Sequence, residues 1–338
     1  MGKTDAPAGE APFKPWPGLG AWGRNLVLAG GNGELFYYDV PAAVKRDGGN
    51  TAAAGQNASA GFAAGRAQNG SPVLVLIHGL GDEADSWRHI IPRLSAAGCR
   101  SLAPDLPGFG RSAVRGRINL DRHAALLLSF MQETGAASPG RPAALAGNSL
   151  GAVIAELAAS RRPDLVKALI LIDGCFPLSG GPDRGLLLMG LPFIGKRWYR
   201  AFRKDHGGAW KSLYPYYHNL DGMDRADKEF LRERVIDRVE SAGQERAYFA
   251  SLRSMNMLSL FGGAALSFAV RIFPGKILLL WGSEDRIVPE NRTAEFRSLR
   301  GDAELRIIKK AGHLPHQEKP EETADEMLRF LAGVNNGG

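Results

Sequence analysis

The sequence has few cysteines and no long hydrophobic run, and these two absences exclude several classes of protein. Its 338 residues include only Cys99 and Cys175, with no Cys-x-x-Cys pair and no Cys/His spacing. Neither a disulfide framework nor a zinc site is therefore indicated. The longest apolar stretch, Met257 to Val270, is interrupted by serines and paired glycines. It is shorter than the roughly 18 residues of a membrane span, so we expect no integral membrane segment.

The N-terminus lacks the apolar core of a secretory signal, and no segment matches a nucleic-acid-binding motif. We therefore expect a cytoplasmic protein that binds no nucleic acid. The net charge is +7, and the densest basic cluster, Lys196–Lys204, also contains aromatic residues. Such a cluster suits a lipid surface. We favour a solvated helix face with two or three buried aromatic side chains, because charge runs usually face solvent.

Two segments are poor in large apolar residues. Residues 1–22 are rich in Pro, Gly and Ala, and residues 47–71 are dominated by Gly, Ala, Asn and Ser. Such segments bury too little surface to order themselves, so we expect a flexible N-terminal arm and a flexible insertion. Between them, two strand-like runs on either side of Gly30–Gly33 predict a hairpin.

From Val73 onward, short apolar runs alternate with helical stretches. Strands are predicted in the run that leads into Ser149 and at residues 73–77, 99–103, 167–172, 277–281 and 304–308. Helices are predicted after Ser149 and at residues 86–97, 120–134, 290–299 and 320–331. This alternation predicts a parallel sheet with helices on both faces. Residues 176–273 show no clear strand, so we expect a mostly helical insertion there.

The most informative motif is Gly147-Asn148-Ser149-Leu150-Gly151, a Gly-x-Ser-x-Gly sequence. It joins an apolar run to an Ala/Leu-rich helical stretch, as expected where a strand turns sharply into a helix and exposes one serine. A residue at so tight a bend has strained backbone, and neighbouring chain must pass close to Gly147 and Gly151. We interpret Ser149 as a candidate nucleophile, with Gly147, Asn148 and Gly151 forming its elbow.

Two other residues with catalytic side chains also follow predicted strands. Asp285 lies in the loop after the run that ends at Trp281, and His313 follows the last predicted strand. A serine hydroxyl needs a base, and histidine, with a pKa of about 6.5, suits that role. A carboxylate on the far ring nitrogen orients the histidine and stabilises its charged form. We therefore predict a catalytic triad of Ser149, His313 and Asp285.

Each member of this triad also has other interpretations. Asp285 could cap the helix that follows it, and Glu284 or Asp173 could supply the acid instead. His313 could be a hydrogen-bonded loop residue, with His316 as a competing base. The occurrence of all three residues in the expected order favours the triad.

A developing oxyanion needs hydrogen-bond donors that are fixed before the reaction. The backbone N–H of Leu150, next to Ser149, is one candidate. The loop after residues 73–77 begins His78-Gly79-Leu80, and we assign the second donor to the N–H of Leu80. We interpret His78, beside Gly79, as organising this loop, because a buried polar ring seeks backbone partners.

Taken together, these motifs resemble the α/β-hydrolase superfamily, and within it the capped esterase/lipase-like members. The resemblance rests on the His-Gly-Leu-Gly run, the elbow, the Trp-Gly-Ser-Glu-Asp loop, the Gly-His turn and residues 104–112. It covers about residues 25–331. It implies an α/β-hydrolase fold, with a mostly parallel central sheet flanked by helices and a helical cap inserted after the sixth strand. The core then comprises residues 23–174 and 271–334, and the cap comprises residues 175–270.

The resemblance also separates structural from catalytic residues. Within Pro104–Ser112 it implies a structural turn in which Asp105 and Arg111 form an internal polar anchor. Haloalkane dehalogenases and epoxide hydrolases of this fold have an aspartate at the elbow, so Ser149 argues against both activities. Epoxide hydrolases also usually have proline at the position of Gly81.

Asn148 keeps another reaction open. An asparagine before the serine is similar to the Gly-Asn-Ser-Met-Gly-Gly elbow of the carbon–carbon bond hydrolases that cleave meta-cleavage products. Leu150 and Ala152 depart from that pattern. A ligand-binding protein without turnover is a further alternative.

We expect a serine hydrolase that cleaves small or medium apolar carboxylic esters, or thioesters, by two-step acyl transfer. This mechanism needs no metal or organic cofactor. The Met and aromatic residues of the expected cap fit either an apolar pocket or ordinary core packing.

Overall fold

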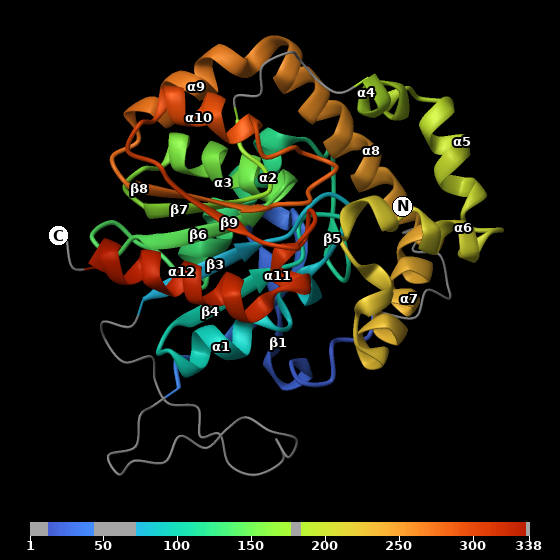
Figure 1. The fold of residues 1–338 in the computed structure, drawn as a ribbon, viewed down its shortest axis with the longest axis horizontal. Coiled ribbons are helices and arrows are strands. Elements are labelled where there is room, and N and C mark those ends of the chain that lie inside the picture. The colour runs from blue at the N-terminus through green and yellow to red at the C-terminus, as the bar shows by residue number, and fades with distance from the viewer. Residues whose placement is uncertain (1–12, 44–71, 177–183, 336–338) are drawn as a thin grey trace.

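The computed structural model describes residues 13–43, 72–176 and 184–335 (Figure 1). The insertion expected over residues 47–71 lies outside the described residues, as does the first part of the expected arm. Residues 13–22 do not belong to a loose arm, because Phe13 and Leu19 are buried. The backbone N–H of Trp16 also donates to Asp85 Oδ1 over 2.7 Å. These few contacts order a Pro/Gly-rich segment whose composition predicts disorder.

A central sheet has the strand order β1-β2-β4-β3-β6-β7-β8-β9, with the short strand β5 paired to β2. The strands are β1 Gly23–Leu28, β2 Gly33–Val40, β3 Val73–Ile77, β4 Arg100–Pro104, β5 Ala113–Val114, β6 Ala143–Asn148, β7 Val166–Ile172, β8 Lys276–Gly282 and β9 Glu304–Ile308. Strands β1, β2 and β5 pair antiparallel, and the run from β4 to β9 is parallel. The predicted strands are therefore confirmed. Strand β5 was not predicted, because two residues are too few to give a recognisable pattern.

The register of the parallel strands aligns the ends that carry the candidate site. Ile77 pairs with Gly147, and Asn148 pairs with Ile172. Ile172 in turn pairs with Leu280. The chain segments that follow β3, β6, β7 and β8 therefore leave the sheet at one edge, where open parallel sheets bind their ligands.

Helices cover both faces of the sheet, as predicted (Figure 1). The two faces bury separate apolar clusters, one with Val75 and Phe130 and the other with Leu76 and Phe330. The core helices are α1 Ile90–Ala96, α2 Leu120–Glu133, α3 Leu150–Arg161, α10 Arg292–Leu299, α11 Pro315–Glu318 and α12 Pro320–Asn335, with the short turns η1 Gly20–Trp22, η2 Ala29–Gly31 and η3 Ala84–Trp87. The helix predicted over residues 86–97 is divided into η3 and α1.

Only helices occur among the described residues between β7 and β8. They are α4 Arg184–Gly190, α5 Ile194–Ala201, α6 His206–Lys211, η4 Tyr214–Tyr216, η5 Leu220–Gly222, α7 Arg225–Glu240, α8 Ala242–Met257, η6 Leu258–Gly262 and α9 Gly263–Ile272. Leu231, Phe249 and Leu252 belong to an apolar cluster of this helical segment. In the basic cluster Lys196–Lys204, Tyr199 is buried, as expected, but Trp198 is 56% exposed. The expectation of buried aromatic side chains is therefore wrong for Trp198.

Helices α8, η6 and α9 form one continuous helix of 31 residues, which by length and composition alone could cross a membrane. The sequence-based search missed it because the helix runs through the serines and glycines that divide the apolar stretch. Hydrogen bonds tie its inner side to the core, between Gln244 Nε2 and Gly81 O (3.0 Å) and between His123 Nε2 and Ser251 Oγ (2.8 Å). Only 17% of its most apolar 18-residue window is buried inside the protein, so this helix differs from the mostly buried core helices of soluble proteins that pass the same test.

A buried ion pair forms the polar anchor in residues 104–112. The Arg111 guanidinium donates to both carboxylate oxygens of Asp105, over 2.8 and 2.9 Å. It also lies 2.6 Å from Asp85 and over the ring of Phe36. Burial alone would raise the pKa of Asp105, but Arg111 and backbone N–H donors outweigh burial and lower it. This anchor joins β2, β4 and the η3 region.

We expect Arg111→Met to lower the free energy of unfolding by about 3–5 kcal/mol, because it leaves two buried carboxylates without their cation. Urea denaturation measures the change. The matched control is Arg161→Met, which removes a surface ion pair with Asp121 and should have a far smaller effect. Equal losses in the two variants would show that the anchor is not a stabilising pair.

Candidate active site

Ser149 occupies a strained bend between β6 and α3. Its φ of 52° and ψ of −115° are unusual for a residue other than glycine. An added Cβ at Gly147 would overlap the backbone of Gly151, and one at Gly151 would overlap the carbonyl of Ile77. The two glycines of the motif therefore allow the close backbone packing that holds the bend.

A third glycine supports the same bend. An added Cβ at Gly174 would lie 2.6 Å from Ser149 Cα, so a side chain there would displace the serine. Sequence reasoning missed Gly174. Its only signal is its place just after β7, the strand next to β6 in the sheet.

Asp285 and His313 form a buried hydrogen-bonded pair. His313 Nδ1 lies 2.8 Å from Asp285 Oδ2, and both side chains are almost fully shielded from solvent. The other oxygen, Asp285 Oδ1, accepts the N–H groups of Ile287 (2.7 Å) and Val288 (3.0 Å). These bonds fix the carboxylate against the histidine ring, so Asp285 does not cap α10, which begins at Arg292.

The competing residues Glu284 and His316 point elsewhere. Glu284 is exposed, and its carboxylate contacts the hydroxyl of Ser283 at 3.3 Å. His316 is buried, with Nε2 2.8 Å from Ser86 Oγ and its ring stacked on Trp87. Burial lowers the pKa of His316 to about 3, so its ring is neutral at ordinary pH.

The elbow and the cap hold the backbone of His313. Asn148 Nδ2 donates to the carbonyls of His313 (3.1 Å) and Ile172 (3.2 Å). The N–H of His313 donates to the carbonyl of Tyr216 in η4 over 2.8 Å. The residue next to Ser149 is thus bonded directly to the loop of the candidate base. With its side chain turned to the backbone, Asn148 has a positioning role.

Asp173 adds a second carboxyl group beside this pair. It follows β7 with a φ of 47°, and its Oδ1 accepts the N–H of Gly282 over 2.8 Å. Single ligand atoms of Asp173, Asp285 and His313 all lie within 4.8 Å of one another. Burial, and then the charge of Asp285, raise the pKa of Asp173 well above its usual range. The neutral form avoids repulsion between two adjacent carboxylates.

Two carboxylates and a histidine at this spacing also have the composition of a metal site. The contacts already described account for their arrangement. His313 Nδ1 is engaged by Asp285, and Asp173 Oδ1 is engaged by Gly282.

The loop after β3 passes over the elbow. Leu106 N–H donates to His78 Nε2 over 2.8 Å, so His78 Nδ1 carries the proton and donates to Gly79 O, also over 2.8 Å. Burial lowers the pKa of His78, in agreement with this neutral tautomer. An added Cβ at Gly79 would lie 3.6 Å from Ser149 Cβ. The chain therefore passes beside the serine immediately before Leu80, and on the other side Leu150 begins α3.

A set of cap–core contacts was not foreseen from the sequence. Arg238 in α7 donates to Glu83 over 2.8 Å and also pairs with Asp82. Tyr248 in α8 lies against Gly81, where an added Cβ would be 3.2 Å from its ring. These pairs are separated by more than 150 residues, so no local pattern announces them. They fix the cap on the loop that contains Leu80.

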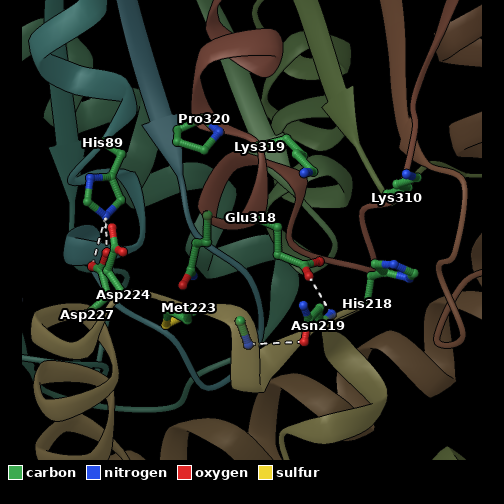
Figure 2. A pocket seen from close by; sticks show the side chains of 12 residues that line it. His89, His218, Asn219, Met223, Asp224, Asp227, Lys310, Glu318, Lys319 and Pro320 are labelled. Atoms are coloured by element: carbon green, nitrogen blue, oxygen red, sulfur yellow. Dashed lines mark hydrogen bonds and ion pairs between the residues drawn. The ribbon is translucent and has the colours of Figure 1, made fainter.

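A cavity of about 370 Å³ lies between η5, the start of α7 and the α11–α12 region (Figure 2). Its lining includes His89, which pairs with Asp227 at 2.9 Å, together with Lys310 and Glu318. Neither Ser149 nor His313 belongs to that lining. The cavity is therefore separate from the candidate catalytic residues.

Comparison with known proteins fits this geometry. Residues 74–326 match the model of the alpha/beta hydrolase family. The chain belongs to this family. The predicted α/β-hydrolase fold and the esterase/lipase-like resemblance are thereby confirmed.

Three proteins illustrate the similarity. The chain is 28% identical to a pimeloyl-[acyl-carrier protein] methyl ester esterase of Cronobacter sakazakii, over 78% of this chain and 94% of the relative. It is 25% identical to a 2-hydroxy-6-oxononadienedioate/2-hydroxy-6-oxononatrienedioate hydrolase of a Pseudomonas species, over 79% and 90%. The solved structure of a thermophilic esterase from Thermogutta terrifontis superimposes with a TM-score of 0.66 at 18% identity, covering 92% of this chain and 98% of that one.

The two aspartates near His313 should respond differently to the same substitution. Asp285→Asn should lower kcat for p-nitrophenyl acetate by about 10³- to 10⁴-fold, because the amide favours the wrong histidine tautomer. Asp173→Asn should keep kcat within about threefold, because an amide replaces a carboxyl that is already neutral. Steady-state rates measure both. A larger loss of kcat in Asp173→Asn than in Asp285→Asn would make Asp173 the orienting acid.

The pH dependence of stability should also change in Asp173→Asn. The folded protein holds a proton on Asp173 that the unfolded chain releases above about pH 4. The carboxyl group thus lowers the free energy of unfolding as pH rises from about 4 toward its raised pKa. The amide does not titrate, so the variant should gain stability relative to the wild type as pH rises from about 4 toward the raised pKa of Asp173. Urea denaturation across this range measures the difference in the free energy of unfolding between the variant and the wild type. A difference that does not change with pH would contradict a neutral Asp173.

Proposed function

We propose that this protein is a serine hydrolase that cleaves carboxylic esters, including thioesters, by two-step acyl transfer. One observation carries the proposal. The buried pair of His313 and Asp285, 2.8 Å apart, belongs to a loop that is hydrogen-bonded to Asn148, the residue next to the strained Ser149. A base with a fixed orienting acid, on a loop bonded to the residue next to a half-buried serine, is an arrangement that can activate a hydroxyl nucleophile.

In the proposed mechanism His313 takes the proton of Ser149 as its oxygen attacks the substrate carbonyl. The N–H groups of Leu80 and Leu150 stabilise the oxyanion of the tetrahedral intermediate. His313 then protonates the leaving group, and an acyl-enzyme forms. Water, deprotonated by the same histidine, attacks the acyl group and releases the acid, which restores Ser149. The proton that His313 gives to the leaving group is replaced by one from the attacking water, so the cycle restores Ser149 and His313 without a cofactor.

Two findings support a small or medium apolar ester as the substrate. The side chains of Leu80, Tyr248 and Met255 are partly buried and belong to apolar clusters of both the core and the cap. An apolar surface where these two clusters meet would suit the acyl part of an ester. The similarity to a methyl ester esterase points in the same direction.

A carbon–carbon bond hydrolase is the second candidate, and the 25% identity to a dienedioate hydrolase favours it. Asn148, which links the sequence to that group, has a buried side chain engaged by two carbonyl groups. Its presence is explained by this positioning role without a role in substrate choice. A ligand-binding protein without turnover is the third candidate.

A fluorophosphonate probe separates enzymes from non-catalytic members of the fold. We expect the wild-type protein to be labelled on Ser149 and the Ser149→Ala variant to remain unlabelled, with mass spectrometry of the labelled peptide as the measurement. Asp173→Asn, which should stay active, is the matched control. Folded wild-type protein that takes no label would contradict the proposal.

A substrate panel then separates the two reactions. We expect p-nitrophenyl esters of increasing acyl length to be hydrolysed with a maximum at short or medium chains. A dienoate with a carbon–carbon scissile bond should not be cleaved. Cleavage of the dienoate alone would assign the second candidate.

A further inference from the structure

Exposed apolar side chains are concentrated on one part of the cap. Ten of the twelve large hydrophobic side chains that are exposed among the described residues lie in α4–α5 or in the long α8–η6–α9 helix. These ten, which we call the apolar cap face, are Leu188, Leu191, Phe193, Ile194, Trp198, Met257, Leu260, Phe261, Phe268 and Ile272. Phe193 is 86% exposed and Phe261 82% exposed. A protein that exposes such a patch uses it to bind a partner or a lipid surface.

On the long helix these residues form a stripe. Met257, Phe261, Phe268 and Ile272 recur at intervals of four, seven and four residues, which places them on one side of a helix. Leu266 and Val270, between them in the sequence, are buried and face the protein. The outer side of this helix is therefore apolar, where a surface helix of a soluble protein normally has polar residues.

The two parts of the face are joined. Asn256 Nδ2, just before Met257, donates to the carbonyl of Leu186 in α4 over 3.1 Å. An added Cβ at Gly190 would lie 2.8 Å from the same amide. Figure 1 shows α4, α5, α8 and α9 along one side of the molecule, away from α1 and α12.

The two chain segments that form the apolar cap face contain basic but no acidic residues. No acidic residue occurs in residues 184–204 or 246–283, whereas Arg197, Lys204 and Arg271 are exposed there. The nearby Glu245 is neutralised by Arg200 and Arg203, at 2.7 and 2.9 Å. The guanidinium carbon of Arg271 lies 5.4 Å from the centre of the Phe268 ring, so a cationic group lies directly beside an exposed apolar residue of the face.

We propose that the apolar cap face docks on an anionic phospholipid surface. Exposed Phe, Trp and Leu side chains enter the boundary between headgroups and acyl chains, and flanking Lys and Arg side chains attract anionic headgroups. The long helix lies along the lipid surface and does not span the membrane, because its inner side is bonded to Gly81 and His123. The acid-free, basic segments that form the face favour an anionic lipid over a neutral apolar partner.

Docking brings the candidate site close to the lipid. Gly263 of the long helix lies against Phe176, where an added Cβ would be 3.3 Å from the ring. Phe176 follows the Gly174 that touches Ser149. Docking itself does not depend on the proposed reaction, because it uses side chains outside the candidate catalytic group.

Vesicle co-sedimentation tests the proposal with the full chain carrying Ser149→Ala, which prevents lipid hydrolysis. We expect binding to vesicles of phosphatidylcholine and phosphatidylglycerol in equal parts, little binding to pure phosphatidylcholine, and loss of binding at high salt. Adding Phe193→Asp and Phe261→Asp should lower the bound fraction by about tenfold or more. The matched control is Val27→Asp, which changes a 74% exposed apolar residue on β1 and should leave binding intact.

Two further measurements keep the outcome clear. The Phe193→Asp and Phe261→Asp changes in the otherwise wild-type chain should leave probe labelling at Ser149 unchanged, which shows that the fold is intact. Equal vesicle binding with and without these changes would overturn the proposal. Light scattering that shows a dimer lost in the double variant, without vesicle binding by either protein, would assign the face to a second copy of the chain. If the wild-type protein binds vesicles but is not labelled by the fluorophosphonate probe, only the proposed reaction is contradicted.

Discussion

The close approach of backbone segments around Ser149 is the constraint on which the arrangement of the candidate site depends. The serine has a positive φ, a conformation that costs on the order of 1–3 kcal/mol for a residue with a side chain. Glycines on β6, on α3 and after β7 allow their segments to lie against the bend. The strain is held by packing from three sides, so the bend is rigid before a substrate arrives.

Hydrogen bonds transmit this rigidity from the elbow to the residues around it. Asn148 bonds the elbow to the loop of His313, and Gly282 bonds β8 to Asp173. Two backbone N–H groups hold Asp285 against the histidine. Each candidate side chain is therefore positioned by backbone at the ends of adjacent parallel strands, a firmer support than flexible side chains would give.

Buried charge in this protein is either paired or removed. Asp105 keeps its charge because Arg111 lies beside it, whereas Asp173 lies beside another carboxylate, that of Asp285, and favours the neutral form. The same contrast distinguishes the two aspartates near His313. Only Asp285 combines backbone donors with the imidazole, which is the environment that an orienting acid requires.

The cap has two sides with different contacts. Its inner side contacts the loop of Leu80 through Gln244 and Tyr248, and its outer side exposes Phe261 and Phe268. A single helix thus connects the candidate site to the surface that we propose binds lipid. This arrangement explains why an apolar stretch interrupted by serines and glycines persists on the outside of a folded protein.

The sequence alone determined the strands, the elbow and the three candidate catalytic residues, because apolar runs, glycine spacing and chain order are local signals. It also implied the Asp105–Arg111 anchor through resemblance. Only the tertiary structure decided between Asp285 and Asp173 as the partner of His313, since both follow buried strands and differ only in what surrounds them. It likewise revealed the support of Gly174, the packing of residues 13–22 and the exposure of Phe261. These depend on contacts between distant segments, which no local pattern records.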